Sequence, residues 1–368
     1  MKIVIISRPP LKALTRKFSV TRHHILKRIA AAGDEVVPLD IAPARIRNPY
    51  LSYGLGILLA PWRFRGLRPD VVLADDLESG LAAVLIKLIY HVPVVFNFLD
   101  DYALIASYEG RGLRFKALRF LEKLVPRMSD GIIAVDRPKE RWFLGRGTPP
   151  AKVRYVANGA DLTVYRPSRA EKSLKDKLGL GRSPVVLFVG KMNKYYELGD
   201  VIRSIPAVLK ARPRTKFLFV GDGDDRSALE SLAAGLGVRE AAVFAGFQPA
   251  EDIPRLINLA EVCVFPLPDS SALAIFEYMA CAKPVVLPGG GTDKMNMPFD
   301  MVPEDCAVHI PAGPEGFARG VIRLLKDRTL AQSIGRRAEK LVRREYDWDV
   351  LALRFRSALA DFAGKGRS

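Results

Sequence analysis

Short apolar strands alternate with helix-length segments along this chain, and the pattern runs through twice. In the first half the predicted strands are residues 3–6, 35–39, 71–74, 94–98, 131–135 and 153–156. In the second half they are residues 185–189, 217–220, 242–245, 262–266 and 285–287. Strands separated by helices in this way form parallel sheets from βαβ units. The sequence therefore predicts an α/β protein with two doubly wound, Rossmann-like domains.

A polar, lysine-rich segment at about residues 160–182 separates the two halves. We predict an N-terminal domain of residues 1–165, completed by a C-terminal helix at about residues 349–364, and a C-terminal domain of residues 166–348. Open parallel sheets bind ligands beyond the carboxyl ends of their strands. Two such domains facing each other predict a ligand cleft between them.

The chain is strongly basic, with 57 Lys and Arg, 40 Asp and Glu, and a formal net charge of +17. Residues 1–168 hold 27 of the basic and 15 of the acidic residues, a net of +12. Such a charge attracts nucleic acid, anionic membranes or phosphorylated small molecules, or serves only as a solvated surface. The basic residues lack interleaved aromatics and a known reader motif, which disfavours a nucleic-acid partner.

Cysteine usage and hydropathy indicate a cytoplasmic protein. The three cysteines, Cys263, Cys281 and Cys306, show no metal-ligand spacing, so we expect a reducing compartment and no metal site. The apolar run near the N-terminus is too short for a secretory signal. The most apolar stretch, residues 80–99, is interrupted by a lysine, a histidine and Pro93, which argues against a membrane-spanning helix.

The segment from Asp269 to Pro284 is the most informative for function. It predicts a helix that begins at a Ser270 or Ser271 N-cap and ends before the proline. A helix start that follows a strand offers free N–H groups to a diphosphate. Asp269 and Glu277 would lie about 12 Å apart along the helix, beyond the roughly 5–9.5 Å of paired hydrolase carboxylates. They suit opposite ends of one elongated ligand, and the alternative is an ordinary capped helix.

This segment resembles the signature of the family 4 glycosyltransferases, which have the GT-B fold. The resemblance rests on the run from Glu277 through Met279-Ala280 to Lys283-Pro284-Val285-Val286. It extends over nearly the whole chain, through Asn158-Gly159-Ala160-Asp161, Tyr165, Pro167, Gly190, Gly221-Asp222-Gly223, Gly246-Phe247 and Tyr346-Asp347-Trp348. It implies a retaining, metal-independent transferase that moves a sugar from a nucleotide-diphosphate donor, UDP- or GDP-linked, to an acceptor hydroxyl, with no separate cofactor.

The resemblance also implies residue roles. Glu277 should bind the ribose hydroxyls, and Asp269 should sit near the sugar as a catalytic residue. Lys191 stands where the family has an arginine on the diphosphate, and Lys194 would supply a second cation because Leu198 occupies the usual lysine position. The remaining residues of the predicted donor site are Gly190, Gly221, Gly223, Ser270, Ser271 and Phe247, the last beside the base.

Asp100 and Asp101 follow the strand at residues 94–98, where relatives often carry a His-Asp pair that reaches the sugar. No histidine is present at this place. The two aspartates are candidates for catalysis or for contact with the acceptor. The alternative is that they only cap a helix.

A predicted helix at residues 113–125 carries Lys116, Arg119, Lys123 and Arg127 on one face at helical spacing. This face is either solvated or a site for a lipid-linked glycan acceptor or an anionic membrane surface. The apolar segment Leu51–Trp62 is a second candidate membrane-facing element. Two further alternatives to a transferase remain open, a nucleotide-sugar epimerase of similar fold and an inactive scaffold.

Overall fold

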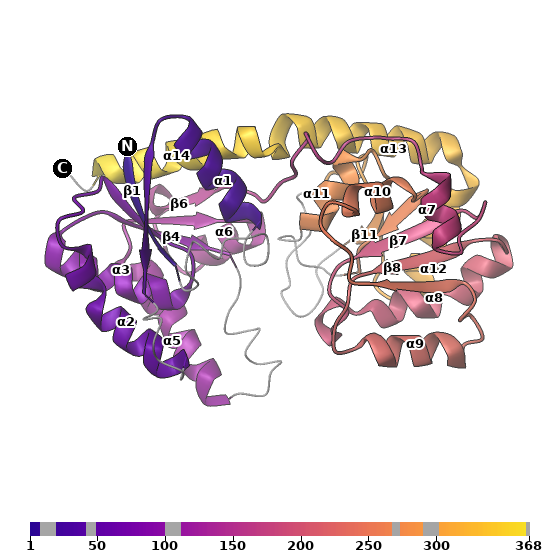
Figure 1. Ribbon diagram of the computed structural model, residues 1–368, viewed down its shortest axis with the longest axis horizontal. Coiled ribbons are helices and arrows are strands. Elements are labelled where there is room, and N and C mark those ends of the chain that lie inside the picture. Colours follow the sequence, from indigo (N-terminus) through magenta and orange to yellow (C-terminus); the bar gives the residue numbers. More distant parts are fainter. Residues whose placement is uncertain (8–19, 42–48, 100–111, 267–272, 290–301, 366–368) are drawn as a thin grey trace. The chain divides into compact units, whose positions relative to one another are not determined.

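The computed structural model describes residues 1–7, 20–41, 49–99, 112–266, 273–289 and 302–365 (Figure 1). Its packing divides the chain into two units, Met1–Asn158 with Trp348–Ser368, and Gly159–Asp347. The division falls before the predicted boundary at residue 165. The segment that begins at Gly159 already belongs to the second unit, because Ala160 forms a parallel β-bridge with Asp347.

The first unit is built on a six-stranded parallel sheet in the order β2-β1-β3-β4-β5-β6. Its strands are β1 (Lys2–Ser7), β2 (Glu35–Asp40), β3 (Val71–Ala74), β4 (Val94–Phe98), β5 (Gly131–Ala134) and β6 (Val153–Tyr155). Every residue of β3, β4 and β5 is buried. These central strands are continuous apolar runs because helices cover the sheet on both faces.

The helices of the first unit form two layers. One layer holds α2 (Pro49–Phe64), α3 (Leu77–Tyr90), α5 (Gly112–Met128) and α6 (Arg137–Leu144), and the other holds α1 (Val20–Ala31) and α14 (Trp348–Lys365). Right-handed crossovers require this division, because the chain moves in one direction through α1 and in the other through the remaining connections. Buried Trp348 stacks on His24 at 5.6 Å, which fixes α14 to α1.

The second unit repeats the scheme with the strand order β12-β11-β10-β7-β8-β9. Its strands are β7 (Val185–Val189), β8 (Lys216–Val220), β9 (Ala242–Gly246), β10 (Val262–Val264), β11 (Val285–Pro288) and β12 (Val308–Ile310). Its α-helices are α7 (Lys172–Lys177), α8 (Leu198–Ala211), α9 (Arg226–Gly235), α10 (Ile253–Asn258), α11 (Leu273–Ala280), α12 (Pro314–Lys326) and α13 (Arg328–Leu341). All the strands are parallel, so β7, β8 and β9 end at one edge of the sheet.

Candidate functional site

Three loops are joined by backbone hydrogen bonds at the carboxyl edge of the second sheet. The Met192 N–H donates to the Asp222 carbonyl at 3.0 Å, which links the loops after β7 and β8. The Gly221 N–H donates to the Gly246 carbonyl at 2.9 Å, which links the loop after β8 to the last residue of β9. The predicted donor residues on these loops are therefore held close together by the backbone itself.

Two glycines permit this close approach. Gly221 has a φ of +131°, and a Cβ there would lie 1.9 Å from the Gly190 carbonyl oxygen. At Gly223 a Cβ would lie 2.3 Å from the Met192 carbonyl oxygen. Side chains have no space at either position, so packing between the loops is a sufficient reason for both glycines. A direct contact of these glycines with a donor stays a prediction.

Tyr278 attaches helix α11 to the end of β7. Its hydroxyl accepts a hydrogen bond from the Val189 N–H at 2.6 Å and donates to the Val189 carbonyl at 3.3 Å. The side chain is fully buried, and burial raises the pKa of its hydroxyl far above the ordinary value. The hydroxyl therefore stays neutral and serves as donor and acceptor at once. As a result, the neighbouring Glu277 is held at the edge of the sheet where β7 ends.

Glu277 lies in a poorly hydrated environment. The pKa of its carboxyl group is raised to about 7, chiefly by burial, although a hydrogen bond from the Tyr165 hydroxyl opposes the shift. Burial and the charge of Glu277 raise the pKa of Tyr165, so its hydroxyl remains a donor. Glu277 as a whole is half-buried.

Asn258 positions the segment that carries Tyr165. The Asn258 side chain accepts a hydrogen bond from the Ser168 N–H at 2.9 Å and donates to the Arg166 carbonyl at 3.0 Å. Asn258 is buried at the end of α10. The sequence contained Tyr165 as part of the family resemblance, but nothing in the local pattern indicated that it would meet Glu277.

The predicted donor cations and the predicted base contact are exposed. Lys191 and Lys194 are both solvent-accessible on the loop after β7. Leu198, which occupies the usual lysine position, is 2% exposed and belongs to the core. Phe247, directly after β9, is 74% exposed. An exposed aromatic ring offers a surface on which a planar base could stack.

The other predicted catalytic and donor residues lie outside the described residues. They are Asp100, Asp101, Asp269, Ser270 and Ser271. Helix α11 is described from Leu273 onward, so its predicted N-cap and the separation of Asp269 from Glu277 stay predictions. Within the described ranges, no group of three histidines, cysteines or acids is arranged to hold a metal ion.

The first sheet carries a buried polar pair that the sequence did not single out. The Asn97 amide donates to the Asp75 carboxylate at 2.8 Å, and these residues are 5% and 1% exposed. They lie where β4 and β3 end, at the carboxyl edge of this sheet. Buried polar groups need such mutual hydrogen bonds because their desolvation is costly. Their pairing comes from adjacent strands, so no sequence spacing could have predicted it.

The predicted basic face of α5 is only partly free. Lys116, Lys123 and Arg127 are exposed. Arg119 instead pairs with the buried carboxylate of Glu122 at 3.1 Å, so most of its charge is balanced within the helix. Three of the four predicted cations thus face solvent. In the described part of the chain, no helix is both long and apolar enough to cross a bilayer.

Two family models match the two halves of the chain. Residues 170–341 match "Glycosyl transferases group 1", and residues 12–159 match "Glycosyl transferase 4-like domain". The chain belongs to the group 1 glycosyltransferases. The loops after β7, β8 and β9 and helix α11 all lie within the first matched region, which contains the predicted donor-binding half.

Two curated relatives are similar to part of this chain. It is similar to an uncharacterized glycosyltransferase, MJ1607, of Methanocaldococcus jannaschii, with 30% identity over 246 residues, 64% of this chain and 61% of the relative. It is also similar to the GDP-mannose-dependent alpha-(1-6)-phosphatidylinositol monomannoside mannosyltransferase of Mycolicibacterium smegmatis, with 26% identity over 195 residues. That match covers 50% of this chain and 51% of the relative, so the chain spans between half and two thirds of the length of these relatives.

The structural comparison concerns the fold. Anabaena HepE in complex with UDP-glucose has a TM-score of 0.76 with this chain, at 17% identity, and the match covers 98% of this chain and 99% of that one. The predicted GT-B fold, with two Rossmann-like domains, is confirmed.

Proposed function

We propose that the protein transfers a sugar from a UDP- or GDP-linked donor to an acceptor hydroxyl, with retention of configuration and without a divalent metal. The observation that carries the proposal is the arrangement at the carboxyl edge of the second sheet. Tyr278 holds α11 against the end of β7, which brings the region of Glu277 to the loop that carries Lys191. A carboxylate and a cation at one sheet edge suit the two ends of a nucleoside diphosphate.

Each group has a defined chemical task in this proposal. Ionised Glu277 accepts hydrogen bonds from two ribose hydroxyls, because a carboxylate offers acceptors only. The Tyr165 hydroxyl donates to the same carboxyl group and stabilises its orientation. Lys191, with Lys194, balances the negative charge that develops on the diphosphate as the sugar leaves. Asp269 lies near the sugar, and the donor phosphate accepts the acceptor proton, so the protein needs no nucleophile of its own.

We further propose that the acceptor is lipid-linked and is met at the cytoplasmic face of an anionic membrane. Four large apolar side chains of α2 are 43–71% exposed, and they are Leu51, Leu55, Leu58 and Trp62. They recur every three or four residues and so form one stripe along the helix. Monomeric soluble proteins rarely expose a contiguous apolar surface of this kind.

The charges around the stripe fit a membrane of negative charge. Helix α2 contains no acidic residue, and Arg63 and Arg65 lie at its end. The neighbouring α3 exposes two further apolar side chains, Leu88 and Ile89. An apolar face bordered by cations is typical of proteins that bind in the membrane interface. The name of the Mycolicibacterium relative, which specifies a phosphatidylinositol monomannoside acceptor, agrees with this choice.

A thermal-shift series tests the donor assignment. We expect UDP or GDP, and the matching nucleotide sugars, to raise the Tm of the full chain, because a ligand that binds only the native state stabilises it by about 2.7 kcal/mol at 100 times its Kd. ADP serves as the control for nonspecific nucleotide binding. Equal shifts with all three nucleotides, or none, would contradict the assignment. Transfer with the active donor in the presence of EDTA, with the product anomer read by NMR, then tests metal independence and retention.

Sedimentation with vesicles tests the membrane assignment. We expect the double variant Leu58→Ser/Trp62→Ser to bind anionic vesicles roughly 10²- to 10⁴-fold more weakly, because each of the two apolar side chains contributes about 1.5–3 kcal/mol on full burial. Leu353→Ser is the matched control, since Leu353 is 66% exposed on α14, which covers the other face of the sheet. Equal binding by the double variant and the control would remove the membrane role from this stripe.

A further inference from the structure

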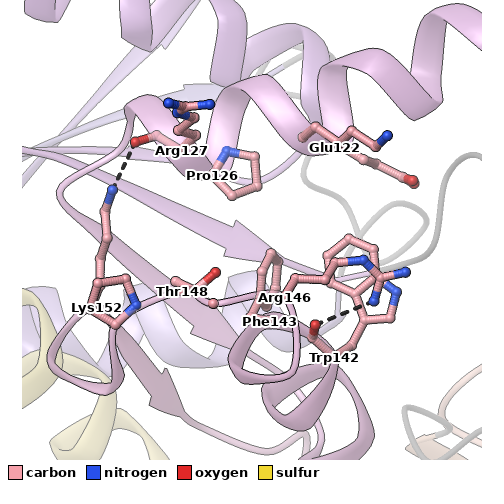
Figure 2. A pocket seen from close by; sticks show the side chains of 11 residues that line it. Glu122, Pro126, Arg127, Trp142, Phe143, Arg146, Thr148 and Lys152 are labelled. Carbon is pink, nitrogen blue, oxygen red and sulfur yellow. Dashed lines mark hydrogen bonds between the residues drawn. The ribbon is translucent and has the colours of Figure 1, made fainter.

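A pocket lies in the first unit, between α5 and α6 (Figure 2). Its volume is about 580 Å³, and it is lined by the last turns of both helices and by the loop that leads into β6. Helix α5 ends just before β5 begins, and Lys152 directly precedes β6, so the pocket lies toward the amino edge of the sheet. Substrate sites of open parallel sheets occupy the opposite edge. The pocket is therefore separate from the donor site proposed above, and it includes Lys123 and Arg127 of the predicted basic face of α5.

The charge on the pocket wall is strongly positive. Four basic side chains line it, and they are Lys123, Arg127, Arg146 and Lys152. Among the described residues, none of the four has an ion-pair partner within 4.0 Å. The acid in the lining, Glu122, is 1% exposed and already paired with Arg119. The wall thus presents four cations and no available carboxylate to a ligand.

Lys152 is held in the pocket despite an unfavourable environment. Its ammonium group donates to the Arg127 carbonyl at 2.8 Å, which fixes it beside the end of α5 (Figure 2). Burial and the nearby charge of Lys87 lower the pKa of Lys152. A bound anion would stabilise this ammonium group directly.

An aromatic side chain forms a rigid wall of the same pocket. Trp142 stacks on Phe98 with ring centroids 5.9 Å apart and meets Phe143 edge-on at 4.9 Å. The Arg146 guanidinium lies 4.0 Å from the Trp142 ring centroid and donates to the Trp142 carbonyl at 3.4 Å. Because packing against Phe98 and Phe143 fixes the Trp142 ring, this wall of the pocket is formed before a ligand arrives, which lowers the entropy cost of binding.

We propose that this pocket binds a phosphate-bearing ligand, with its anionic group among the four cations and its apolar part beside Pro126 and Pro149. Arginine and lysine bind phosphate oxygens through charge-assisted hydrogen bonds, and two prolines, Pro126 and Pro149, provide apolar contact. The same chemistry occurs in the phosphomonoester headgroup of a membrane lipid and in a soluble phosphorylated compound. This assignment does not depend on the identity of the donor.

Calorimetric titration with inorganic pyrophosphate is the first test. All proteins in this measurement are full-length and carry Lys191→Gln and Lys194→Gln. These substitutions weaken pyrophosphate binding at the proposed donor site, which a diphosphate also fits. We expect Arg127→Gln/Arg146→Gln in that background to bind pyrophosphate roughly 10- to 100-fold more weakly, since two charged hydrogen-bond donors are lost. Lys210→Gln/Lys340→Gln is the matched control, because both lysines are exposed on helices of the other unit.

Vesicle binding is the second test, and it distinguishes a lipid headgroup from a soluble phosphorylated compound. Binding is compared between vesicles with phosphatidic acid, a phosphomonoester, and vesicles of equal charge with phosphatidylglycerol, a phosphodiester. If the double variant loses a preference for phosphatidic acid, the ligand of the pocket is a lipid headgroup. If it loses only pyrophosphate binding, the ligand is a soluble phosphorylated compound. The proposal is overturned if neither arm separates the double variant from its control. Lys123→Gln, a single change at an exposed side chain, replaces the double variant if that variant unfolds at a lower temperature.

Discussion

Glu277→Gln should lower kcat/KM for sugar transfer by roughly 10²–10³-fold, equivalent to about 3–4 kcal/mol of lost stabilisation. The substitution preserves the shape of the side chain but removes the charge that would accept two ribose hydroxyls. Transfer is measured under subsaturating donor, and Glu339→Gln on α13 is the control because its carboxylate pairs with Arg343 on the surface. A loss smaller than about threefold would remove Glu277 from the donor site.

The pH dependence of the same variant separates a donor-binding role from a structural one. The pKa of Glu277 is about 7 in the unliganded protein, so lowering the pH protonates the group that the donor requires. Wild-type affinity for the nucleotide should therefore fall by up to about tenfold per pH unit below pH 7. Glu277→Gln cannot titrate and should lose this slope. A nucleotide affinity with the same slope in both proteins would show that another group is responsible.

Stability should change in the opposite direction. A carboxyl group with a raised pKa favours the folded state only while it is protonated, below its unfolded pKa, and this contribution is lost as the pH rises through about 7. Removing the charge by Glu277→Gln should raise the Tm of the unliganded protein by about 2–5 °C near pH 8 and leave it unchanged near pH 4. An activity loss together with a stability gain is characteristic of a binding group held in an unfavourable environment.

The regular elements could be predicted from the sequence because their burial is local. Strands β3 and β4 occupy the predicted residues 71–74 and 94–98, since a strand buried on both faces is a continuous apolar run. Helix α2 was identified only as an apolar segment. Gly54, Gly56 and Pro61 are helix-breaking signals, and the contacts that fit them into a helix are long-range, such as the hydrogen bond from the Tyr90 hydroxyl to the Pro61 carbonyl at 2.8 Å.

The candidate site likewise has features that the sequence could predict and features that it could not. Glu277 and Lys191 were predicted from the family resemblance, which places residue types at fixed positions. The contact of Tyr165 with Glu277, and the anchoring of α11 by Tyr278, depend on which strands become neighbours in the sheet. No periodicity connects residues so distant in sequence. For the same reason, the pocket between α5 and α6 could not be predicted, although its cation Lys123 was identified as part of a basic helix face.

Gly221→Ala should destabilise the second unit by about 3–5 kcal/mol, because a Cβ at this position clashes with backbone atoms that cannot shift without disturbing the loop. The new atom would lie 1.9 Å from the Gly190 carbonyl oxygen, and the φ of +131° disfavours any side chain. Calorimetry should resolve an unfolding transition shifted to lower temperature. The nucleotide-induced rise in Tm should shrink as well, because the loop that carries Lys191 must separate from the loop after β8.

Gly237→Ala isolates the effect of the close approach. Gly237 also has a positive φ, +69°, but no atom lies within 4 Å of its Cβ position. Its substitution should cost only about 1–2 kcal/mol of backbone strain and leave the nucleotide-induced shift intact. If both variants lose the same stability, strain alone explains the glycine at position 221. If Gly221→Ala loses more, and loses nucleotide binding with it, the contact between the two loops is what builds the proposed diphosphate site.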